Sequence, residues 1–232
     1  MQKQELETDY FIAIQATYEG VDLALCKVGT VLEQLSISKF DASRLVLTVL
    51  DQLLNKQGIT LAASAFVVVN QGPGPFTTLR TVLATVNGLA YARGIPLVGV
   101  DGIVTLATAY QKERGGMVVG LLNAFNQDVY YAVAQPNAKN EIGFGHGSSF
   151  IRQLSVQFPD TTITFVGNGV RPLQAEIEGV FGSHAFLISP NVHTASIKQI
   201  AMQGLSQWQK QLNVVTQLMP IYLKQHSAEL KL

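Results

Sequence analysis

Residues 67–100 read VVVNQGPGPFTTLRTVLATVNGLAYARGIPLVGV. The run Ala65–Asn70, which contains Phe66 and the valines 67–69, is short and apolar, as is typical of a strand buried on both faces. The turn Gln71–Thr78, rich in glycine and proline, opens a helix predicted from about Thr77 to Arg93, and Gly94 marks its end. Ile95–Val100 is a second apolar strand. This order of strand, turn, helix and strand predicts a chain of the α/β class.

The residues before this stretch predict a meander and a helix. Strands are expected at Tyr10–Ala16, Val21–Lys27 and Val31–Ser38, with a hairpin turn at residues 28–30. Between Asp41 and Lys56, leucine and valine recur at helical spacing, so this segment predicts a helix with Asp41 as its N-cap.

The residues after it repeat the same order of elements. After a helix over Gly102–Gln111, strands are expected at 117–123, 129–135 and 141–144, then a helix at 148–157, a strand at 162–166 and the turn Gly167-Asn168-Gly169. A strand at 185–188 and a helix at 194–211 close the chain. We therefore predict two tandem lobes, 1–112 and 113–232, each a mixed sheet with flanking helices, and leave room for the last helix and tail to pack back on the first lobe. This order suggests the actin/hexokinase/Hsp70-like (ASKHA) architecture, which by itself says little about activity.

Composition limits the function classes. The 232 residues are 47% hydrophobic and only 14% charged, which predicts buried strands and at least one apolar contact surface. Sixteen basic and sixteen acidic residues give a net charge of zero. A protein that binds nucleic acid alone normally has a basic excess, so another subunit is expected to hold any RNA.

Other features favour a reducing compartment. The single cysteine, Cys26, allows no internal disulfide and is expected to be buried in its strand. The N-terminus is polar and acidic, unlike a secretory signal, and the apolar stretches are interrupted before about 18 residues. We expect a cytoplasmic protein without a transmembrane helix.

Residues 72–100 closely resemble the signature of the TsaB family, roughly GPGSFTGLR, a helix ending GLAYA, and GIPLVGV. Asp41–Leu54, Asn123–Val133 (family DARRGEVYWA) and Pro220–Lys224 (family PxYLR) are similar to further family segments. The resemblance implies a non-catalytic scaffold subunit in the transfer of a threonylcarbamoyl group to the adenosine next to the anticodon of tRNA. It implies a TsaD-like catalytic partner, a TsaE-like ATPase, a homodimer when alone, contact with tRNA only through the complex, and no membrane partner.

The chain departs from the family pattern at several positions. Gln15-Ala16-Thr17 replaces Asp-Thr-Ser at the end of the first strand, where an ATPase of this fold places its phosphate loop and a metal-organising carboxylate. These departures leave open whether this copy keeps its usual partner. The others are Asp41 for His, Pro75 for Ser, Thr78 for Gly, and Asn123 and Phe125 for the Asp and Arg of DAR.

A glycine-rich turn that opens a helix can bind an anion through backbone N–H groups. Thr17, Gly72, Gly74 and Thr77 are therefore weak candidates for nucleotide binding, although no Walker pattern is present. The competing interpretation is a tight strand-to-helix turn, with Pro75 near the first helical position and Thr77 or Thr78 as cap. It is favoured because Pro75 has no N–H and Gln15 is not a carboxylate. We expect no cofactor in the isolated chain and allow for ATP at an interface of the complex.

Neither a metal nor a catalytic residue is predicted. The four histidines, at 146, 184, 193 and 226, lack ligand spacing, and the HxxxH pair of the catalytic homologue is missing. No GxSxG or HExxH pattern occurs. Two alternatives stay open: a small-molecule kinase or ATPase of the actin-like fold, which would need carboxylates for Mg²⁺, and a homodimer with a divergent role.

The helix Thr77–Arg93 predicts a contact surface. Ala84, Gly88 and Ala92 recur every four residues and form a smooth ridge, close to an apolar stripe that includes Leu79 and Leu83. Glycine in mid-helix costs about 1 kcal/mol relative to alanine, which is tolerable where another backbone comes close. In the TsaB family the first two helices contact the TsaD subunit or a second TsaB. The predicted interface residues are Asp41, Leu45, Val49, Leu79, Leu83, Ala84, Gly88 and Ala92.

Overall fold

A computed structural model describes residues 10–189 and 192–223, which divide into two compact units. The first unit comprises residues 10–100 and 196–220, and the second comprises the remaining described residues. The sequence predicts a boundary at residue 112. In the structure α3 (Gly102–Arg114) packs on strands β6 and β7 of the second unit, so the boundary follows Val100.

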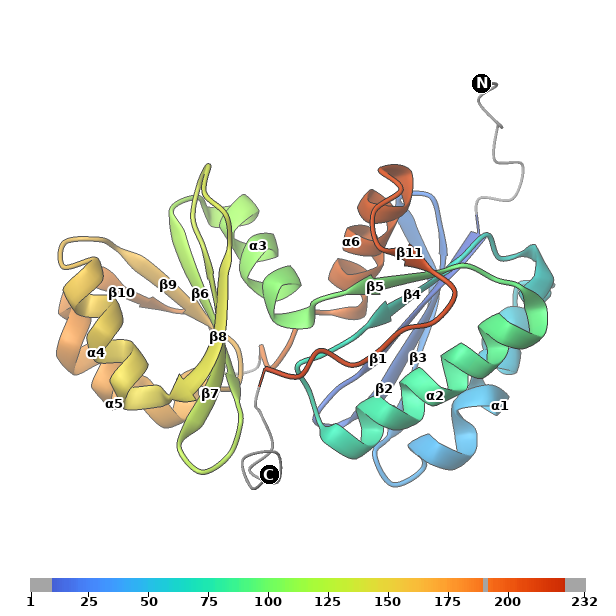
Figure 1. Ribbon diagram of the computed structural model, residues 1–232, viewed down its shortest axis with the longest axis horizontal. Helices are drawn as coiled ribbons and strands as arrows, with labels where there is room; N and C mark the ends of the chain where they lie inside the picture. The colour runs from blue at the N-terminus through green and yellow to red at the C-terminus, as the bar shows by residue number, and fades with distance from the viewer. Residues whose placement is uncertain (1–9, 190–191, 224–232) are drawn as a thin grey trace, which may run out of the picture. The chain divides into compact units, whose positions relative to one another are not determined.

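The first unit contains a six-stranded mixed sheet in the order β11-β5-β4-β1-β2-β3 (Figure 1). The first three strands form the predicted antiparallel meander, while β4 pairs in parallel with β1 and β5 in parallel with β4. The α/β prediction is thereby confirmed for this unit. The strands are β1 (Tyr10–Ala16), β2 (Gly20–Lys27), β3 (Thr30–Ser38), β4 (Val67–Asn70), β5 (Leu97–Val100) and β11 (Val214–Val215).

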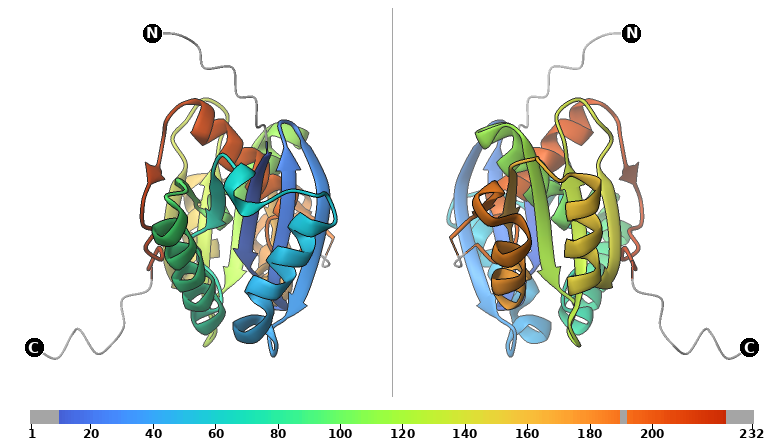
Figure 2. Two further views of the ribbon diagram at one scale, coloured as in Figure 1. Left: turned by 90° about the vertical axis from the view of Figure 1, so that its right-hand side faces the viewer. Right: turned by 90° about the vertical axis from the view of Figure 1, so that its left-hand side faces the viewer.

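Helices cover both faces of this sheet because β4 is apolar on both faces. Val67 and Val69 join the core beneath α1 (Ala42–Asn55) and α2 (Phe76–Arg93), which lie side by side in Figure 2. Val68 points the other way, toward Gly204 of α6 (Ile197–Gln209). A short 3₁₀ turn, η1 (Leu61–Ala63), precedes β4.

The start of α2 differs from the prediction. Pro75 occupies the N-cap position in an extended conformation, and no side chain caps the helix. The prediction of Thr77 or Thr78 as cap was therefore wrong, because the helix begins at Phe76 and both threonines lie inside its first turn. The helix ends as predicted at Gly94, whose N–H donates to the carbonyl of Ala90.

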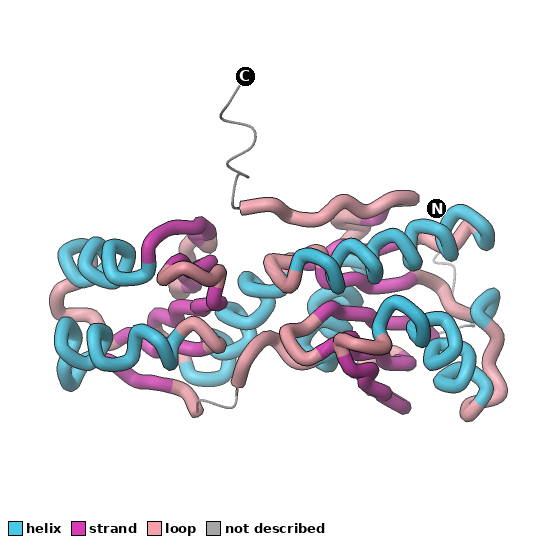
Figure 3. The backbone as a smooth tube through the Cα atoms, turned by 90° about the horizontal axis from the view of Figure 1, so that it is seen from below, coloured by secondary structure: helices cyan, strands magenta, loops and turns pink. Residues whose placement is uncertain are grey.

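A C-terminal strap, residues 214–219, returns the chain to the first unit. It begins as β11, which pairs antiparallel with β5, and then runs beside α2 (Figure 3). Asn87 of α2 holds the backbone of Leu218 at both ends: its Nδ2 donates to the Leu218 carbonyl, and its Oδ1 accepts from the Leu218 N–H, each at 2.9 Å. The Leu218 side chain is buried in the core. The sequence leaves room for the tail to pack on the first lobe, as it does here, but it does not predict the strand β11 or the contact with α2.

The second unit repeats the order of elements in a five-stranded sheet, β10-β9-β6-β7-β8. One face carries α4 and α5, and the other carries α3, whose Ile103 and Ala107 lie against Gly120 of β6. Asp101 caps α3 by accepting from the N–H groups of Ile103 and Val104, and burial raises the pKa of its carboxyl. The elements are β6 (Met117–Asn123), β7 (Asp128–Ala134), β8 (Glu141–His146), α4 (Gly147–Gln157), β9 (Ile163–Val166), α5 (Val170–Phe181), η2 (Gly182–His184) and β10 (Ala185–Leu187).

In the described part of the chain, no helix is both long enough and apolar enough to cross a membrane.

Candidate partner-binding face and the turn before α2

The turn between β4 and α2 is held by a chain of buried amides. Asn70 Oδ1 accepts from the Gly72 N–H at 2.9 Å, and Asn70 Nδ2 donates to Gln15 Oε1 at 3.5 Å. Gln15 Nε2 in turn donates to Asp22 Oδ2 at 3.1 Å. Gln15 and Asn70 are only 1% and 5% exposed. The residue that replaces the family carboxylate thus serves to fix the turn.

Of the other nucleotide candidates, all of them within the described residues, only Thr17 is held by side-chain hydrogen bonds within the unit. The Thr17 hydroxyl closes the β1–β2 turn, where it accepts from the N–H groups of Glu19 and Gly20. Gly74 lies near the end of β1, since a methyl group there would be 3.8 Å from the Ala16 carbonyl oxygen. Thr77 is exposed on the first turn of α2. The turn and the end of β1 therefore lie close together. The Gly72 N–H and the Thr17 hydroxyl, however, make hydrogen bonds that hold their own turns.

Metal and nucleophile chemistry finds no support in the described residues. Among them, no group of three His, Cys, Asp or Glu side chains could hold a metal ion, and His226 lies outside them. The Asp22 carboxylate accepts from Ser36 at 2.7 Å and from Gln15. Burial raises the pKa of the Cys26 thiol to about 12, so it stays protonated and unreactive near neutral pH.

The predicted ridge on α2 faces away from its own sheet. Ala84, Gly88 and Ala92 are all exposed, and a methyl group added at Gly88 would meet no atom within 4 Å. These three residues therefore do not serve packing inside the unit. A smooth, outward-facing helix surface of this kind allows a second helix to approach closely.

Two of the predicted interface residues lie elsewhere. Leu79 and Leu83 are 4% and 3% exposed and belong to the core between α2 and the sheet. At 100° per residue, Leu79 lies about 180° and Leu83 about 140° around the helix from Gly88. Both side chains therefore face the sheet and cannot contact a partner on the outer face.

The predicted residues of α1 have an intermediate position. Leu45 and Val49 are partly buried and pack against the same core. Asp41 is partly buried at the start of the helix, where it accepts from the Ser38 hydroxyl at 2.9 Å and pairs with Arg44 at 2.7 Å. It stands at the N-cap position as predicted, but its side chain makes no capping hydrogen bond.

Sequence reasoning missed several exposed apolar side chains on the same two helices. Tyr91 of α2 is 94% exposed, Leu47 of α1 is 53% exposed, and Phe40, just before α1, is 85% exposed. Phe76 is also exposed, with the Arg80 guanidinium 3.7 Å from its ring centre. Helical spacing could have found Leu47, since it lies off the stripe formed by Val46, Leu50 and Leu53. Large apolar side chains at the surface mark interaction sites when they gather together.

The departure at Asn123 falls on the last residue of β6, and the departure at Phe125 lies in the turn between β6 and β7. Phe125, Asn126 and Gln127 all have positive φ, at 62°, 53° and 66°. Asn123 Oδ1 accepts from the Phe125 N–H at 2.8 Å, a role that an aspartate oxygen would fill equally well. Phe125 is 65% exposed, so it replaces the family arginine at the surface.

The chain is similar to known proteins over most of its length. A family model described as TsaD, tRNA N6-adenosine threonylcarbamoyltransferase, matches residues 37–231. The tRNA threonylcarbamoyladenosine biosynthesis protein TsaB of Escherichia coli (strain K12) is 28% identical over 59% of this chain and 58% of its own length. The matched part thus spans less than two thirds of that relative. The protein of the same description from Bacillus subtilis (strain 168) is 25% identical over 95% of this chain and 96% of its own length.

Two solved structures show the fold. YeaZ from Pseudomonas aeruginosa superposes with a TM-score of 0.70 and 22% identity, over 93% of this chain and 100% of that one. The ROK hexokinase from Thermus thermophilus has a TM-score of 0.53 and 6% identity, over 87% and 99%. These matches confirm the predicted actin/hexokinase/Hsp70-like architecture.

Proposed function

The chain belongs to the TsaD family of tRNA N6-adenosine threonylcarbamoyltransferase proteins, with TsaB proteins among its relatives, and on this premise we propose that it is a TsaB-type scaffold subunit. It acts in the complex that transfers a threonylcarbamoyl group to the adenosine next to the anticodon of tRNA. A TsaD-like subunit carries the active site, and a TsaE-like ATPase works with it. The chain itself contributes binding surface and no catalytic residue.

The outward-facing ridge on α2 carries this proposal. A chain that worked alone would gain helix stability from alanine at Gly88, because this exposed position has room for a side chain and does not pack inside the unit. Small residues here would allow a partner helix to pack closely, since the distance between packed helices depends on the side chains at the contact. The exposed Tyr91 beside the ridge supplies apolar area to the same contact.

The net charge and the turn before α2 support the proposals on tRNA and on nucleotide. A net charge of zero fits a subunit that reaches tRNA only through the complex. The amides that fix the turn fit an isolated chain without a nucleotide, and any ATP is then held at an interface of the complex. Without the TsaD-like subunit the same ridge supports a homodimer. The setting is the cytoplasm, and no membrane takes part.

Reconstitution tests the function. The chain is combined with the TsaD-like and TsaE-like proteins of the same cell, an activated threonylcarbamoyl donor, ATP and unmodified tRNA. Threonylcarbamoyladenosine, measured by mass spectrometry of the digested tRNA, is expected only in mixtures that contain the chain. Equal modification without it, or no complex between the chain and the TsaD-like protein by gel filtration, would reject the proposal.

The isolated chain is expected to hydrolyse neither ATP nor peptides. The reason is that the residue aligned with the family carboxylate is Gln15, whose amide is buried in the turn network. Phosphate release should equal that of a blank. The rival interpretation, a small-molecule kinase or ATPase, predicts turnover that disappears in Gly74→Ala. This variant is suited to the test because its methyl group fits against Ala16 without collision.

A further inference from the structure

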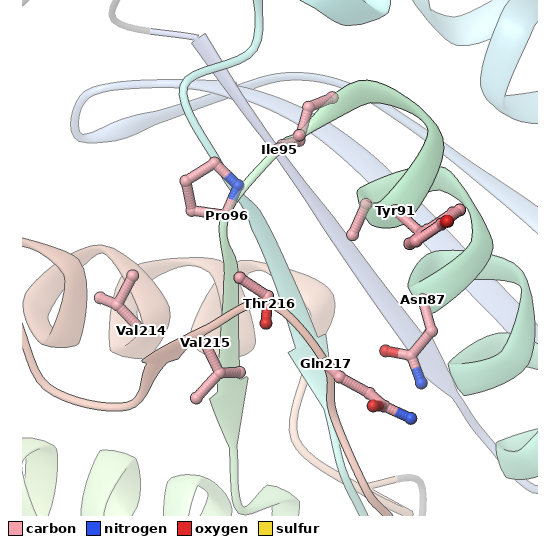
Figure 4. A pocket seen from close by; sticks show the side chains of 10 residues that line it. Asn87, Tyr91, Ile95, Pro96, Val214, Val215, Thr216 and Gln217 are labelled. Carbon is pink, nitrogen blue, oxygen red and sulfur yellow. The ribbon is translucent and has the colours of Figure 1, made fainter.

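A groove of about 630 Å³ lies between α2 and the C-terminal strap (Figure 4). Its volume falls within the range of about 300–1,000 Å³ typical of binding pockets. All of its lining belongs to the first unit. The residues that define it are Asn87 and Tyr91 on the helix, Ile95 and Pro96 at its base, and Val215 and Thr216 on the strap.

The chemistry of the groove is apolar and uncharged. None of the ten lining residues is Asp, Glu, Lys, Arg or His. A phosphate or carboxylate would find no counter-charge there, and its desolvation would be uncompensated. The polar side-chain groups are the amides of Asn87 and Gln217 and the hydroxyls of Tyr91 and Thr216. The groove therefore suits a neutral, apolar occupant.

The walls of the groove are held in place. β11 pairs with β5, which aligns Val214 with Val98 and Val215 with Leu97. Beyond it, the double hydrogen bond from Asn87 and the buried Leu218 side chain fix the strap to α2. Gln71 Nε2 also donates to the Met219 carbonyl at 2.6 Å. Because ordering costs affinity, a groove whose walls are already ordered binds better than a flexible one.

The groove is continuous with the ridge. Asn87 and Tyr91, which line the groove, lie one residue before and three residues after Gly88 on the same helix. Tyr91 is 94% exposed. At about 100° per residue it lies about 60° around the helix from Gly88, on the same side as Asn87 at about 100°. An element that packs along Ala84 and Gly88 therefore lies next to the side of the groove that Tyr91 forms.

We propose that this α2–strap groove receives a short, uncharged apolar segment of the TsaD-like partner. The docking surface then extends past the two helices to the C-terminal strap. This inference rests on the proposed function, because the partner is the one assigned there. The occupant is a protein segment because the groove adjoins the surface that a protein must already cover, and its lack of charge selects apolar side chains.

Thr216→Arg tests the groove. Thr216 is exposed on the strap, and the hydrogen bonds that fix the strap come from Asn87 and Gln71, so the isolated chain should keep its melting temperature. A charge in an apolar contact should weaken binding to the TsaD-like protein by about tenfold or more, measured by isothermal titration calorimetry. Thr216→Val keeps the shape without charge and should bind like the unmodified chain.

Gln209→Arg is the matched control. Gln209 is exposed at the end of α6, on the opposite face of the sheet, so the same added charge should leave the affinity unchanged. If Thr216→Arg binds the TsaD-like protein as tightly as Gln209→Arg does, the groove proposal is wrong while the proposed function stands. If the unmodified chain does not bind that protein at all, the proposed function itself fails.

Discussion

Gly88→Leu is expected to disrupt the complex while leaving the isolated chain folded. Gly88 is exposed in mid-helix, and an added methyl group meets no atom within 4 Å, so the isolated unit has room for a side chain. Leucine is also a better helix former than glycine by somewhat under 1 kcal/mol, so the melting temperature should stay the same or rise. In the complex, the leucine occupies space that a partner helix needs. Overpacking of about 1–3 kcal/mol corresponds to a loss of affinity of roughly five- to 150-fold.

A second exposed helical glycine provides the control for this prediction. Gly179 of α5 lies in the second unit, and a methyl group there likewise meets no atom within 4 Å. Gly179→Leu should raise helix stability in the same way and bind the TsaD-like protein normally. Circular dichroism melting and light scattering of the mixtures separate the two effects. A Gly88→Leu chain that binds as tightly as Gly179→Leu would remove the ridge from the interface.

The sequence predicts the order of strands and helices in both units because the local signals within each segment agree with one another. The apolar run at Val67–Val69, the glycine-rich turn and Gly94 each point to the same strand, turn and helix, and the structure confirms all three. The boundary near residue 100 was harder to place. The sequence pattern of the helix 102–114 would be the same whichever unit it packed on. Only its contacts with β6 and β7 show that it belongs to the second unit.

The interface residues on α2 show what periodicity leaves undecided. This helix carries small or apolar residues around much of its circumference, so a single sequence does not say which stripe the sheet takes. The sheet takes the stripe of Leu79, Leu83 and Val86, and the ridge of Ala84 and Gly88 is left outside. Bulk is the physical reason: the larger side chains bury more apolar area against the strands.

The strap and the turn before α2 depend on contacts between distant residues. Val214-Val215 is too short to signal a strand, and its position is set by the Asn87–Leu218 pair, 131 residues apart. Likewise the sequence GPGP leaves a phosphate loop open, although the missing N–H of Pro75 already favours a simple turn. The amide contact of Asn70 with Gln15, 55 residues apart, favours the simple turn. Side-chain amides of this kind carry no local pattern.

Gly167→Ala should cause a large loss of stability in the second unit. Gly167 follows β9 with a φ of 109°, a conformation that residues with a side chain rarely adopt. An added methyl group would also collide with the Leu121 carbonyl oxygen, which already accepts from the Gly169 N–H at 2.9 Å. Neither backbone can move without breaking the turn. Strain and overpacking of about 1–3 kcal/mol each predict a loss of about 3 kcal/mol or more.

The single tryptophan allows this loss to be assigned to one unit. Trp208 lies on α6 of the first unit, where it stacks on Phe66 with ring centres 4.5 Å apart, while Gly167 lies in the second. In urea, Gly167→Ala should lose helical circular dichroism well before tryptophan fluorescence changes. Gly179→Ala, at an open site in the helix after the same turn, should be as stable as the unmodified chain or more so. If the free energy of unfolding of Gly167→Ala lies within about 1 kcal/mol of that of Gly179→Ala, the turn is not the rigid link between β9 and α5 that its contacts with β6 indicate.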